Sequence, residues 1–310
     1  MSQVAPRVSV VMPAYNAEAT IAEAIDSVLA QDLADLELIV VDDGAIDATA
    51  EIVAGYAARD RRVRLIRQDN AGVSATRNRA IAEARAAYVA FLDADDAWEP
   101  DKLAHQAALL DRRPEVGFCY TAQTIIDGAG RAISTYAVKP DYRGRCLPAL
   151  ARSNGIGLST VMARTELLRA VGGFDETLDL CEDWELWIRL AERTELDYVD
   201  APLTRYRFHP GNSTRDLDRL RAAHLAVLAR CQARYGRDAD SAGAHFKAHM
   251  GFARRYIAFG SLRTGLREAW LALRARPLSV AAYVAVAKLL VSVVLRRRPN
   301  PNMSAQIAKN

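Results

Sequence analysis

Three stretches decide the fold: VSVVMPAYN at residues 8–16, LELIVVDDG at residues 36–44 and YVAFLDADD at residues 88–96. Each begins as a short, largely apolar run and ends in a polar cluster. Short apolar runs of this kind are typical of strands that are buried on both faces, as in a parallel sheet. We therefore expect three buried strands whose carboxyl ends carry the polar side chains.

Segments with helical periodicity separate these strands. Apolar residues recur at helical spacing in residues 21–29, and residues 48–58 and 74–83 repeat the pattern on either side of a strand at residues 63–66. Pro100 stands at a favourable position for the first turn of a fourth helix. This alternation predicts an α/β fold with a Rossmann-like, mostly parallel sheet and helices on both faces.

The alternation loosens beyond Phe118. We expect a strand and its approach at residues 155–163, a helix at residues 182–191 and a last strand at residues 196–199. After Asn212 the pattern is almost entirely helical. The chain therefore ends, on this prediction, in a helical extension.

Charge is divided unevenly along the chain. Residues 1–214 hold 23 Lys and Arg against 33 Asp and Glu, whereas residues 215–310 hold 18 against 5. An acidic first part suits a site that holds cations, and a basic tail suits a surface that meets anions. Membrane lipid fits the apolar content of the tail better than nucleic acid does, and we expect no nucleic-acid partner.

Composition excludes several classes of protein. With 51% hydrophobic and 25% charged residues, disorder is not expected. The first residues lack the basic start and apolar run of a secretory signal, which predicts a cytoplasmic protein. The four cysteines form no CxxC pair, so zinc and dithiol chemistry are not indicated.

The polar clusters should meet in space, because ligands of such sheets gather beyond the carboxyl ends of the strands. The first cluster, PAYN, contains no glycine and is not a dinucleotide-binding loop. Five carboxylates at one edge would repel one another unless a cation or hydrogen-bond donors were present. A divalent ion meets that need, and Mg²⁺ commonly binds through one or two carboxylates plus substrate phosphates. The five are Asp42, Asp43, Asp93, Asp95 and Asp96.

The order PAYN, VVDDG, NAGVSATRN, LDADD, GGFDE, EDWELW resembles the family-2 glycosyltransferases, which have the GT-A fold and invert the anomeric centre. The match covers about residues 8–213. An Asp-x-Asp triplet alone is common by chance, whereas six motifs in order are specific. The resemblance implies a GT-A catalytic domain at residues 1–214, with a nucleotide-sugar half to about residue 115 and an acceptor half at residues 116–214. A basic helical region follows at residues 215–310.

The same resemblance implies the reaction. A sugar would pass from a nucleotide diphosphate, UDP first and dTDP second, to a saccharide or lipid-linked saccharide in cell-envelope or polysaccharide biosynthesis. The cofactor would be Mg²⁺ or Mn²⁺. Two alternatives are a sugar-phosphate nucleotidyltransferase, which expects a glycine-rich basic loop that PAYN does not provide, and an inactive nucleotide-sugar binding protein.

Carried over position by position, the family pattern assigns roles to named residues. Asp43 would bond the base edge, Asp42 would support that pocket, and Arg77 would reach the base or its phosphates. Asp93 would contact the ribose or a water molecule, and Asp95 would ligate the metal. The remaining positions of the nucleotide-sugar pocket are Pro13, Ala14, Tyr15, Asn16 and Ala94. One departure is Ala45, where the family often has serine.

On the acceptor side, Asp183 would be the general base that takes the acceptor's proton. Its alternative role is a carboxylate that complements the dipole at a helix N-terminus. Glu182 and Trp184 are assigned to the acceptor side, although Glu182 also suits a structural role and Trp184 the core. His209 is a candidate metal ligand or a plain loop residue. His245 and His249 have the spacing of a metal pair, but we expect a surface helix there.

The basic tail is expected to meet the cytoplasmic face of a membrane. Residues 278–295 form a largely apolar stretch that three arginines follow at residues 296–298. Lys288, Ser292 and Arg296 make a polar stripe at four-residue spacing, which favours a helix lying in the membrane interface over one crossing it. The alternative is a helical hairpin packed on the catalytic domain.

Overall fold

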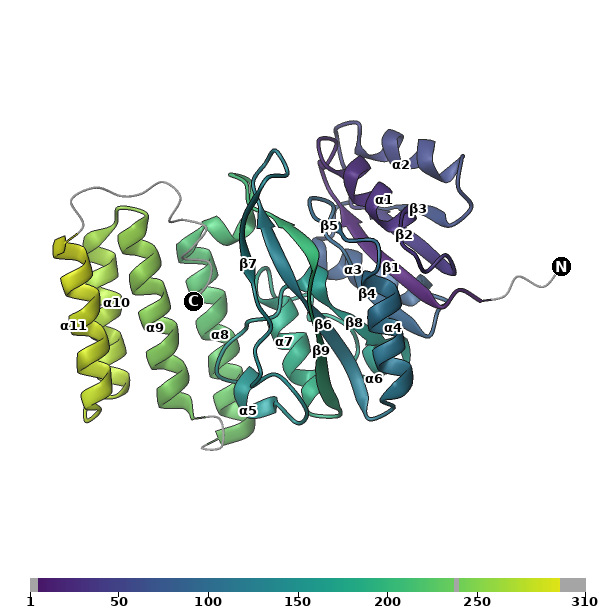
Figure 1. The fold of residues 1–310 in the computed structure, drawn as a ribbon. Helices are drawn as coiled ribbons and strands as arrows, with labels where there is room; N and C mark the ends of the chain where they lie inside the picture. The colour runs from purple at the N-terminus through teal and green to yellow at the C-terminus, as the bar shows by residue number, and fades with distance from the viewer. Residues whose placement is uncertain (1–4, 237–239, 296–310) are drawn as a thin grey trace. The chain divides into compact units, whose positions relative to one another are not determined.

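The structure is a computed structural model, which describes residues 5–236 and 240–295 of the chain. It divides into two compact units (Figure 1). The first comprises residues 1–146 and 155–208, and the second comprises residues 147–154 and 209–310. The first unit holds all the strands found in the described part of the chain, and the second is helical.

The first unit is built on a nine-stranded sheet in the order β3-β2-β1-β4-β8-β6-β9-β5, with β7 paired to β6. Strands β1 to β4 pair in parallel, as expected for a Rossmann-like half. Beyond β4 the sheet is mixed, because β8 runs antiparallel to both β4 and β6 while β6 and β9 are parallel. The strands are β1 Val8–Ala14, β2 Leu36–Asp42, β3 Val63–Arg67, β4 Tyr88–Phe91, β5 Ala97–Trp98, β6 Val116–Ile126, β7 Ala132–Tyr136, β8 Met162–Arg164 and β9 Glu195–Arg207.

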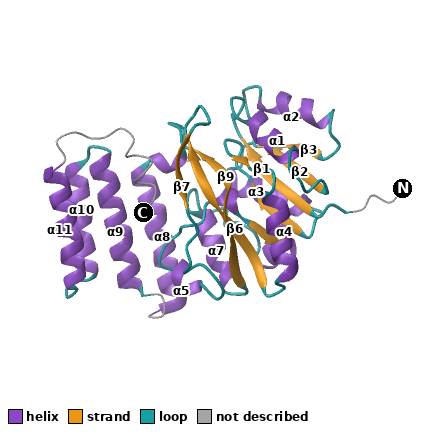
Figure 2. Cartoon of the chain, viewed as in Figure 1, coloured by secondary structure: helices purple, strands orange, loops and turns teal. Residues whose placement is uncertain are grey.

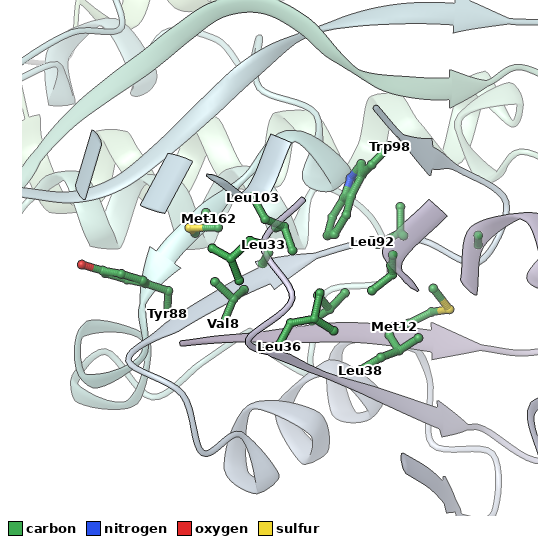
Figure 3. Packing of buried hydrophobic residues seen from close by; sticks show 14 of the residues in the cluster. Val8, Met12, Leu33, Leu36, Leu38, Tyr88, Leu92, Trp98, Leu103 and Met162 are labelled. Atoms are coloured by element: carbon green, nitrogen blue, oxygen red, sulfur yellow. The ribbon is translucent and has the colours of Figure 1, made fainter. Parts of the chain in front are cut away.

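Helices cover both faces of this sheet. Apolar side chains of α1, α2 and α4 join those of β1, β2 and β4 in one cluster, part of which Figure 3 shows around Val8, Met12 and Leu103. On the opposite face, α3 packs on β1 and β2, and Trp187 of α7 contacts Phe91 of β4. The helices of this unit are α1 Ile21–Leu29, α2 Thr49–Ala57, α3 Val73–Glu83, α4 Lys102–Arg112, α6 Thr165–Ala170 and α7 Glu182–Ala191, with a 3₁₀ turn at Leu158–Thr160.

Strand β6 is the longest of the elements that the sequence pattern did not predict, which also include β5, β7 and α6. It runs through the middle of the sheet, yet it contains Thr121, Gln123 and Thr124 among its apolar residues. Thr121 is buried, and its Oγ1 lies 3.2 Å from the Oγ1 of Thr204 on β9. Polar residues paired in this way inside a sheet hide the apolar run by which a buried strand is predicted.

The second unit consists of helices, drawn in purple in Figure 2: α5 Leu147–Leu150, α8 Leu217–Tyr235, α9 Ser241–Ala258, α10 Leu262–Ala275 and α11 Val280–Leu295. Buried residues of α9, α10 and α11 form its core, including Met250, Ala269 and Leu289. Gly265 lets α10 approach α9 closely, because a Cβ there would lie 2.9 Å from the carbonyl oxygen of Ala253. Within the described residues, no helix is both long enough and apolar enough to cross a bilayer.

The structure corrects one expectation in this unit. His249 is not a surface residue: it is buried, and its Nδ1 lies 2.8 Å from a carboxylate oxygen of Glu268 on α10. The carboxylate comes from a neighbouring helix, which a reading of the helix's own sequence could not reveal. The arginines at residues 296–298 lie outside the described residues.

Candidate active site

The three polar clusters lie at one edge of the sheet. In the parallel register Ala14 of β1 is the Cα partner of Asp42 on β2, and Val11 of β1 is the partner of Phe91 on β4. Asp93 follows Phe91 by two residues, so the loop after β4 starts beside the end of β1. The topology therefore gathers PAYN, VVDDG and LDADD, as the strand order predicts.

The PAYN loop is tied to the loop after β2. Asn16 has a positive φ of 48°, and its Oδ1 accepts a hydrogen bond from the backbone N–H of Ile46 at 3.0 Å. Nearby, the Ala17 N–H donates to Thr49 Oγ1 at 2.7 Å. Ala14 is buried and Pro13 half-buried, whereas Tyr15 is 52% exposed. Tyr15, together with Asn16, which is also exposed, therefore offers the surface of this loop to a ligand.

Asp42 and Asp43 are both buried and both hold loops in place. Asp42 accepts from the Ala45 N–H at 3.0 Å and from Arg67 Nε at 3.2 Å. Asp43 accepts from Gln68 Nε2 at 2.8 Å and from the backbone N–H groups of residues 71 and 72 at 2.9 and 3.0 Å. An ionised carboxylate offers about four acceptor positions, so Asp43 keeps about one beyond these three. Asp43 thus fixes the turn that leads into α3.

Arg77 of α3 bridges two parts of the site. Its Nη1 donates to Glu182 Oε1 at 2.6 Å, and its Nη2 donates to Asp93 Oδ1 at 2.7 Å. The side chain is only 5% exposed, and its Nε has no hydrogen-bond partner among the described residues. Burial by itself lowers the pKa of this guanidinium, but the charges of Asp93 and Glu182 raise the pKa overall. Arg77 stays charged and holds the start of α7 beside the loop of residues 92–96 after β4, which we call the aspartate loop.

A glycine turn supports Arg77 from below. The guanidinium carbon of Arg77 lies over the ring of Phe174, 5.4 Å from the ring centroid. Asn78 holds the Phe174 backbone: its Oδ1 accepts the Phe174 N–H at 2.7 Å, and its Nδ2 donates to the Phe174 carbonyl at 2.9 Å. Gly173 has a φ of 68°, and a Cβ there would lie 2.3 Å from Asn78 Oδ1. The GGF sequence is therefore required by the clamp that positions Arg77.

Breaking this bridge should cost much of the stability of the first unit. We expect Arg77→Ala to lower the free energy of unfolding by about 3–5 kcal/mol, because it leaves Glu182 and Asp93 without their cation. Arg79→Ala is the matched control on the same helix: Arg79 is 54% exposed, and its surface pair with Glu83 is worth at most about 1 kcal/mol. Urea unfolding followed by the fluorescence of the buried tryptophans measures both. Equal losses would contradict a stabilising role for the bridge.

Three carboxylates gather in the loop after β4. Oxygen atoms of Asp93, Asp95 and Asp96 all lie within 4.8 Å of one another. Burial raises the pKa of Asp96 well above its usual value, and the charges of Asp95 and Asp93 add to that rise. Oxygen donors that repel one another at this spacing fit a hard divalent cation such as Mg²⁺ or Mn²⁺. Ala94, between the first two, is buried.

Two residues that the sequence motifs did not indicate hold this loop. Ser159 Oγ accepts the backbone N–H of Asp93 at 3.1 Å and also hydrogen bonds to the Asp96 side chain. Arg207, at the end of β9, donates its backbone N–H to Asp96 Oδ1 at 2.9 Å and its Nε to the carbonyl of Asp95 at 2.8 Å. Both residues are buried. Ser159 engages the backbone N–H of Asp93, and Arg207 engages the backbone carbonyl of Asp95, so the loop is fixed from two sides.

Asp183 lies at the start of α7. Cys181, the residue before the helix, has a positive φ of 62°, which turns the chain into the first helical residues. Asp183 is partly exposed, and its Oδ1 accepts the backbone N–H of Trp184 at 2.6 Å. Glu182 is engaged by Arg77. Trp184, expected on the acceptor side, is fully buried and packs in the core, as Trp187 does.

His209 belongs to the second unit. Its Nδ1 accepts the backbone N–H of Gly211 at 3.1 Å, and the backbone N–H of His209 donates to Asn212 Oδ1 at 2.6 Å. The aspartate loop belongs to the first unit. A role for His209 at the metal therefore stays a prediction.

Comparison with known proteins extends this description. The sequence model of glycosyl transferase family 2 matches residues 9–165, about half of the chain. The chain is also 30% identical over 234 residues to the chondroitin synthase of Escherichia coli, an alignment that covers 74% of this chain and 33% of that protein. It spans 23% and 26% of the lengths of two further curated relatives.

Two solved structures share the fold. A mannosyltransferase from Pyrobaculum calidifontis, in complex with GDP-mannose and Mn²⁺, matches with a TM-score of 0.64 and 18% identity over 99% of this chain and 85% of its own. TarS of S. aureus, in complex with UDP-GlcNAc, matches with a TM-score of 0.61 and 20% identity over 98% of this chain and 88% of its own. At such identities the likeness concerns the GT-A architecture.

Proposed function

The chain belongs to the family-2 glycosyltransferases, and from this we propose that it transfers a sugar from a nucleotide diphosphate to an acceptor hydroxyl, with inversion at the anomeric carbon. The bridge made by Arg77 is the observation that carries the proposal. It links Asp93 of the aspartate loop to Glu182 at the start of α7, at 2.7 and 2.6 Å. Arg77 thereby holds the aspartate loop, which would bind the diphosphate, close to the first turn of α7, which carries Asp183.

Asp183 supplies the base in this proposal. The acceptor oxygen attacks the anomeric carbon as its proton passes to the Asp183 carboxylate, while the bond to the diphosphate breaks and its electron pair leaves with the phosphate. Attack from the side opposite the leaving group inverts the centre, by the geometry that also separates inverting from retaining glycosidases. Glu182 is a weaker candidate for the base, because its carboxylate is already paired with Arg77.

Asp95 and its neighbours would hold a divalent ion on the diphosphate. Asp93, Asp95 and Asp96 provide the oxygen donors, although Asp93 is shared with Arg77 and Asp96 with Ser159 and the Arg207 backbone. When bound, Mg²⁺ or Mn²⁺ stabilises the negative charge that builds on the departing phosphate. Asp95 would be the principal ligand, and Arg207 and Ser159 would orient its loop, as residues behind metal ligands commonly do.

The nucleotide would lie at the ends of β1 and β2. Tyr15 offers an exposed ring, and Asp43 keeps about one acceptor position for a base N–H beyond the three it uses for the protein. Uracil, thymine and guanine all present such an N–H, so this position alone does not select the base. Uridine is favoured by the neighbour TarS, which was solved with a UDP-sugar. We therefore propose UDP as the first nucleotide and dTDP as the second, against the GDP-mannose of the other neighbour.

Thermal unfolding with a panel of nucleotides tests the donor. In the presence of Mn²⁺, UDP and its sugars should stabilise the protein more than GDP-mannose at equal concentration, since a ligand at 100 times its Kd stabilises by about 2.7 kcal/mol. Release of free sugar from the stabilising donor then separates an enzyme from an inactive binding protein. Preferential stabilisation by GDP-mannose would overturn the choice of uridine, and stabilisation without any turnover would overturn the enzymatic proposal.

The remaining assignments follow the same proposal. Residues 1–214 would form the catalytic domain, with the nucleotide-sugar half ending near residue 115, and residues 215–310 a separate helical region. The acceptor would be a saccharide or a lipid-linked saccharide in cell-envelope or polysaccharide assembly. The chondroitin synthase among the relatives supports a growing saccharide as acceptor.

A further inference from the structure

The outer surface of the last three helices carries positive charge with almost no negative charge. Residues 241–295 contain 8 Lys and Arg and a single acidic residue, Glu268. Glu268 is 2% exposed, and its carboxylate pairs with Arg221 at 2.8 Å and with His249 at 2.8 Å. Glu268 is therefore engaged inside the helical unit. Helices α9, α10 and α11 contain no other carboxylate that could pair with their exposed Lys and Arg side chains.

One face of α10 combines large apolar side chains in a row. Leu262, Leu266 and Trp270 follow one another at four-residue spacing, which places them on the same side of the helix. They are 46%, 39% and 54% exposed. The buried residues through which α10 packs in the unit, such as Ala269 and Ala272, lie on the adjoining side of the helix. The exposed row is therefore apolar surface that the packing of the unit leaves uncovered.

Arginines lie beside this apolar row. Arg263 and Arg267 each follow a leucine of the row by one position and are exposed, as is Arg274. The Arg274 guanidinium lies 4.8 Å from the ring centroid of Trp270. A helix face with an apolar row flanked by arginines is the arrangement that binds in the plane of a membrane interface. We call Leu262, Arg263, Leu266, Arg267, Trp270 and Arg274 the α10 face.

Helix α11, which packs against α10, also exposes apolar side chains. Five of its large side chains are between 41% and 78% exposed: Val280, Tyr283, Val284, Leu290 and Val291. Lys288 is the one charged residue within the bounds of this helix, and it is exposed. Tyrosine and tryptophan are the residues that gather at the level of lipid headgroups. Both helices thus present aromatic, aliphatic and cationic groups to the outside.

We propose that the α10 face and the exposed side of α11 dock on the surface of an anionic lipid bilayer. Anionic headgroups match the arginines, each worth about 1 kcal/mol near such a surface. The acyl region beneath them takes up the leucine, valine and aromatic side chains, whose exposure to water is unfavourable by about 25 cal/mol per Å². A nucleic acid would account for the arginines but would leave the aliphatic rows in water. Docking goes beyond sugar transfer, since it would bring the enzyme to the surface where lipid-linked acceptors reside.

Trp270 provides a specific probe for this proposal. It is 54% exposed, whereas the other three tryptophans, Trp98, Trp184 and Trp187, are at most 2% exposed. A change in tryptophan emission on adding vesicles therefore reports Trp270. With the full chain, phosphatidylcholine vesicles that contain phosphatidylglycerol should shift the emission to the blue, and brominated lipid should quench it. Vesicles of phosphatidylcholine alone should bind far less.

Charge-neutral variants locate the surface. Arg263→Gln, Arg267→Gln and Arg274→Gln in one protein should lower the partition coefficient onto anionic vesicles roughly 100-fold, since three cations are lost. The matched control carries the same three changes at exposed arginines of α8: Arg219, Arg230 and Arg234. It should bind nearly as the parent does. Circular dichroism of both proteins verifies that the helices are intact.

Three outcomes would overturn the proposal. The first is an absence of binding to anionic vesicles at low salt, and the second is an equal loss in the α10 and α8 variants. The third is a Trp270 that becomes shielded as protein concentration rises without lipid, together with a dimer in sedimentation. That result would assign the face to a second copy of the chain.

Discussion

Replacing Asp95 with asparagine should reduce sugar transfer roughly 10³-fold, because an ion on the diphosphate supplies several kcal/mol of stabilisation to the departing charge. Asparagine keeps the shape of the side chain and removes one negative charge from the three that meet within 4.8 Å. EDTA added to the unaltered protein should produce a loss of similar size, and Mn²⁺ or Mg²⁺ should restore activity. The measurement is the initial rate of nucleotide diphosphate release at saturating donor.

The control for this prediction is Asp101→Asn. Asp101 lies just before α4 and a few residues after the aspartate loop, but its carboxylate belongs to a surface pair with His105 at 3.2 Å. This variant should keep its activity and its response to chelator. Direct binding of Mn²⁺, measured by calorimetry, separates loss of the ion from loss of fold: Asp95→Asn should weaken it while the unfolding curve is kept. Full activity of the unaltered protein in excess chelator would exclude the metal assignment.

The strands that carry the motifs could be predicted because they are buried on both faces. Val8, Val10, Val11 and Met12 are all inaccessible to solvent, so the sequence of β1 is a largely apolar run. Strand β9 was expected only at residues 196–199, yet it extends over Glu195–Arg207. Its later residues mix buried, half-buried and exposed positions and include charged side chains, so no apolar run marks them.

The aspartates of the site could be predicted for a related reason: each follows directly on a predictable strand. The residues that position them could not. Ser159 is 66 positions from Asp93 in the chain, and Arg207 is 111 positions from Asp96. Their contacts depend on β8, β6 and β9 being placed beside β4, which is a property of the whole sheet and not of any local pattern. His209 shows the same limit, because a motif position alone does not establish which groups surround it.

Asp183→Asn should separate catalysis from donor binding. If the Asp183 carboxylate takes the acceptor proton, its amide cannot, and turnover should fall about 10²–10⁴-fold. The fold should persist, because asparagine has the shape of aspartate and its Oδ1 can still accept the Trp184 N–H. Donor affinity should also persist, because the aspartate loop and Arg77 are untouched. Turnover with acceptor and calorimetric binding of the donor measure the two quantities independently.

Glu182 is the residue against which this prediction must be tested, since it precedes Asp183 and carries the same group. Glu182→Gln removes the charge that Arg77 contacts at 2.6 Å, so it should weaken the bridge and lower stability. Its turnover, measured where the protein is fully folded, should fall far less than that of Asp183→Asn. The opposite ranking would place the base at Glu182 and leave Asp183 as a carboxylate that complements the dipole at the helix N-terminus. Near-normal turnover in both variants would place the base on another element. The remaining carboxylate of this first turn, Glu185, is already paired with Arg189 at 2.7 Å.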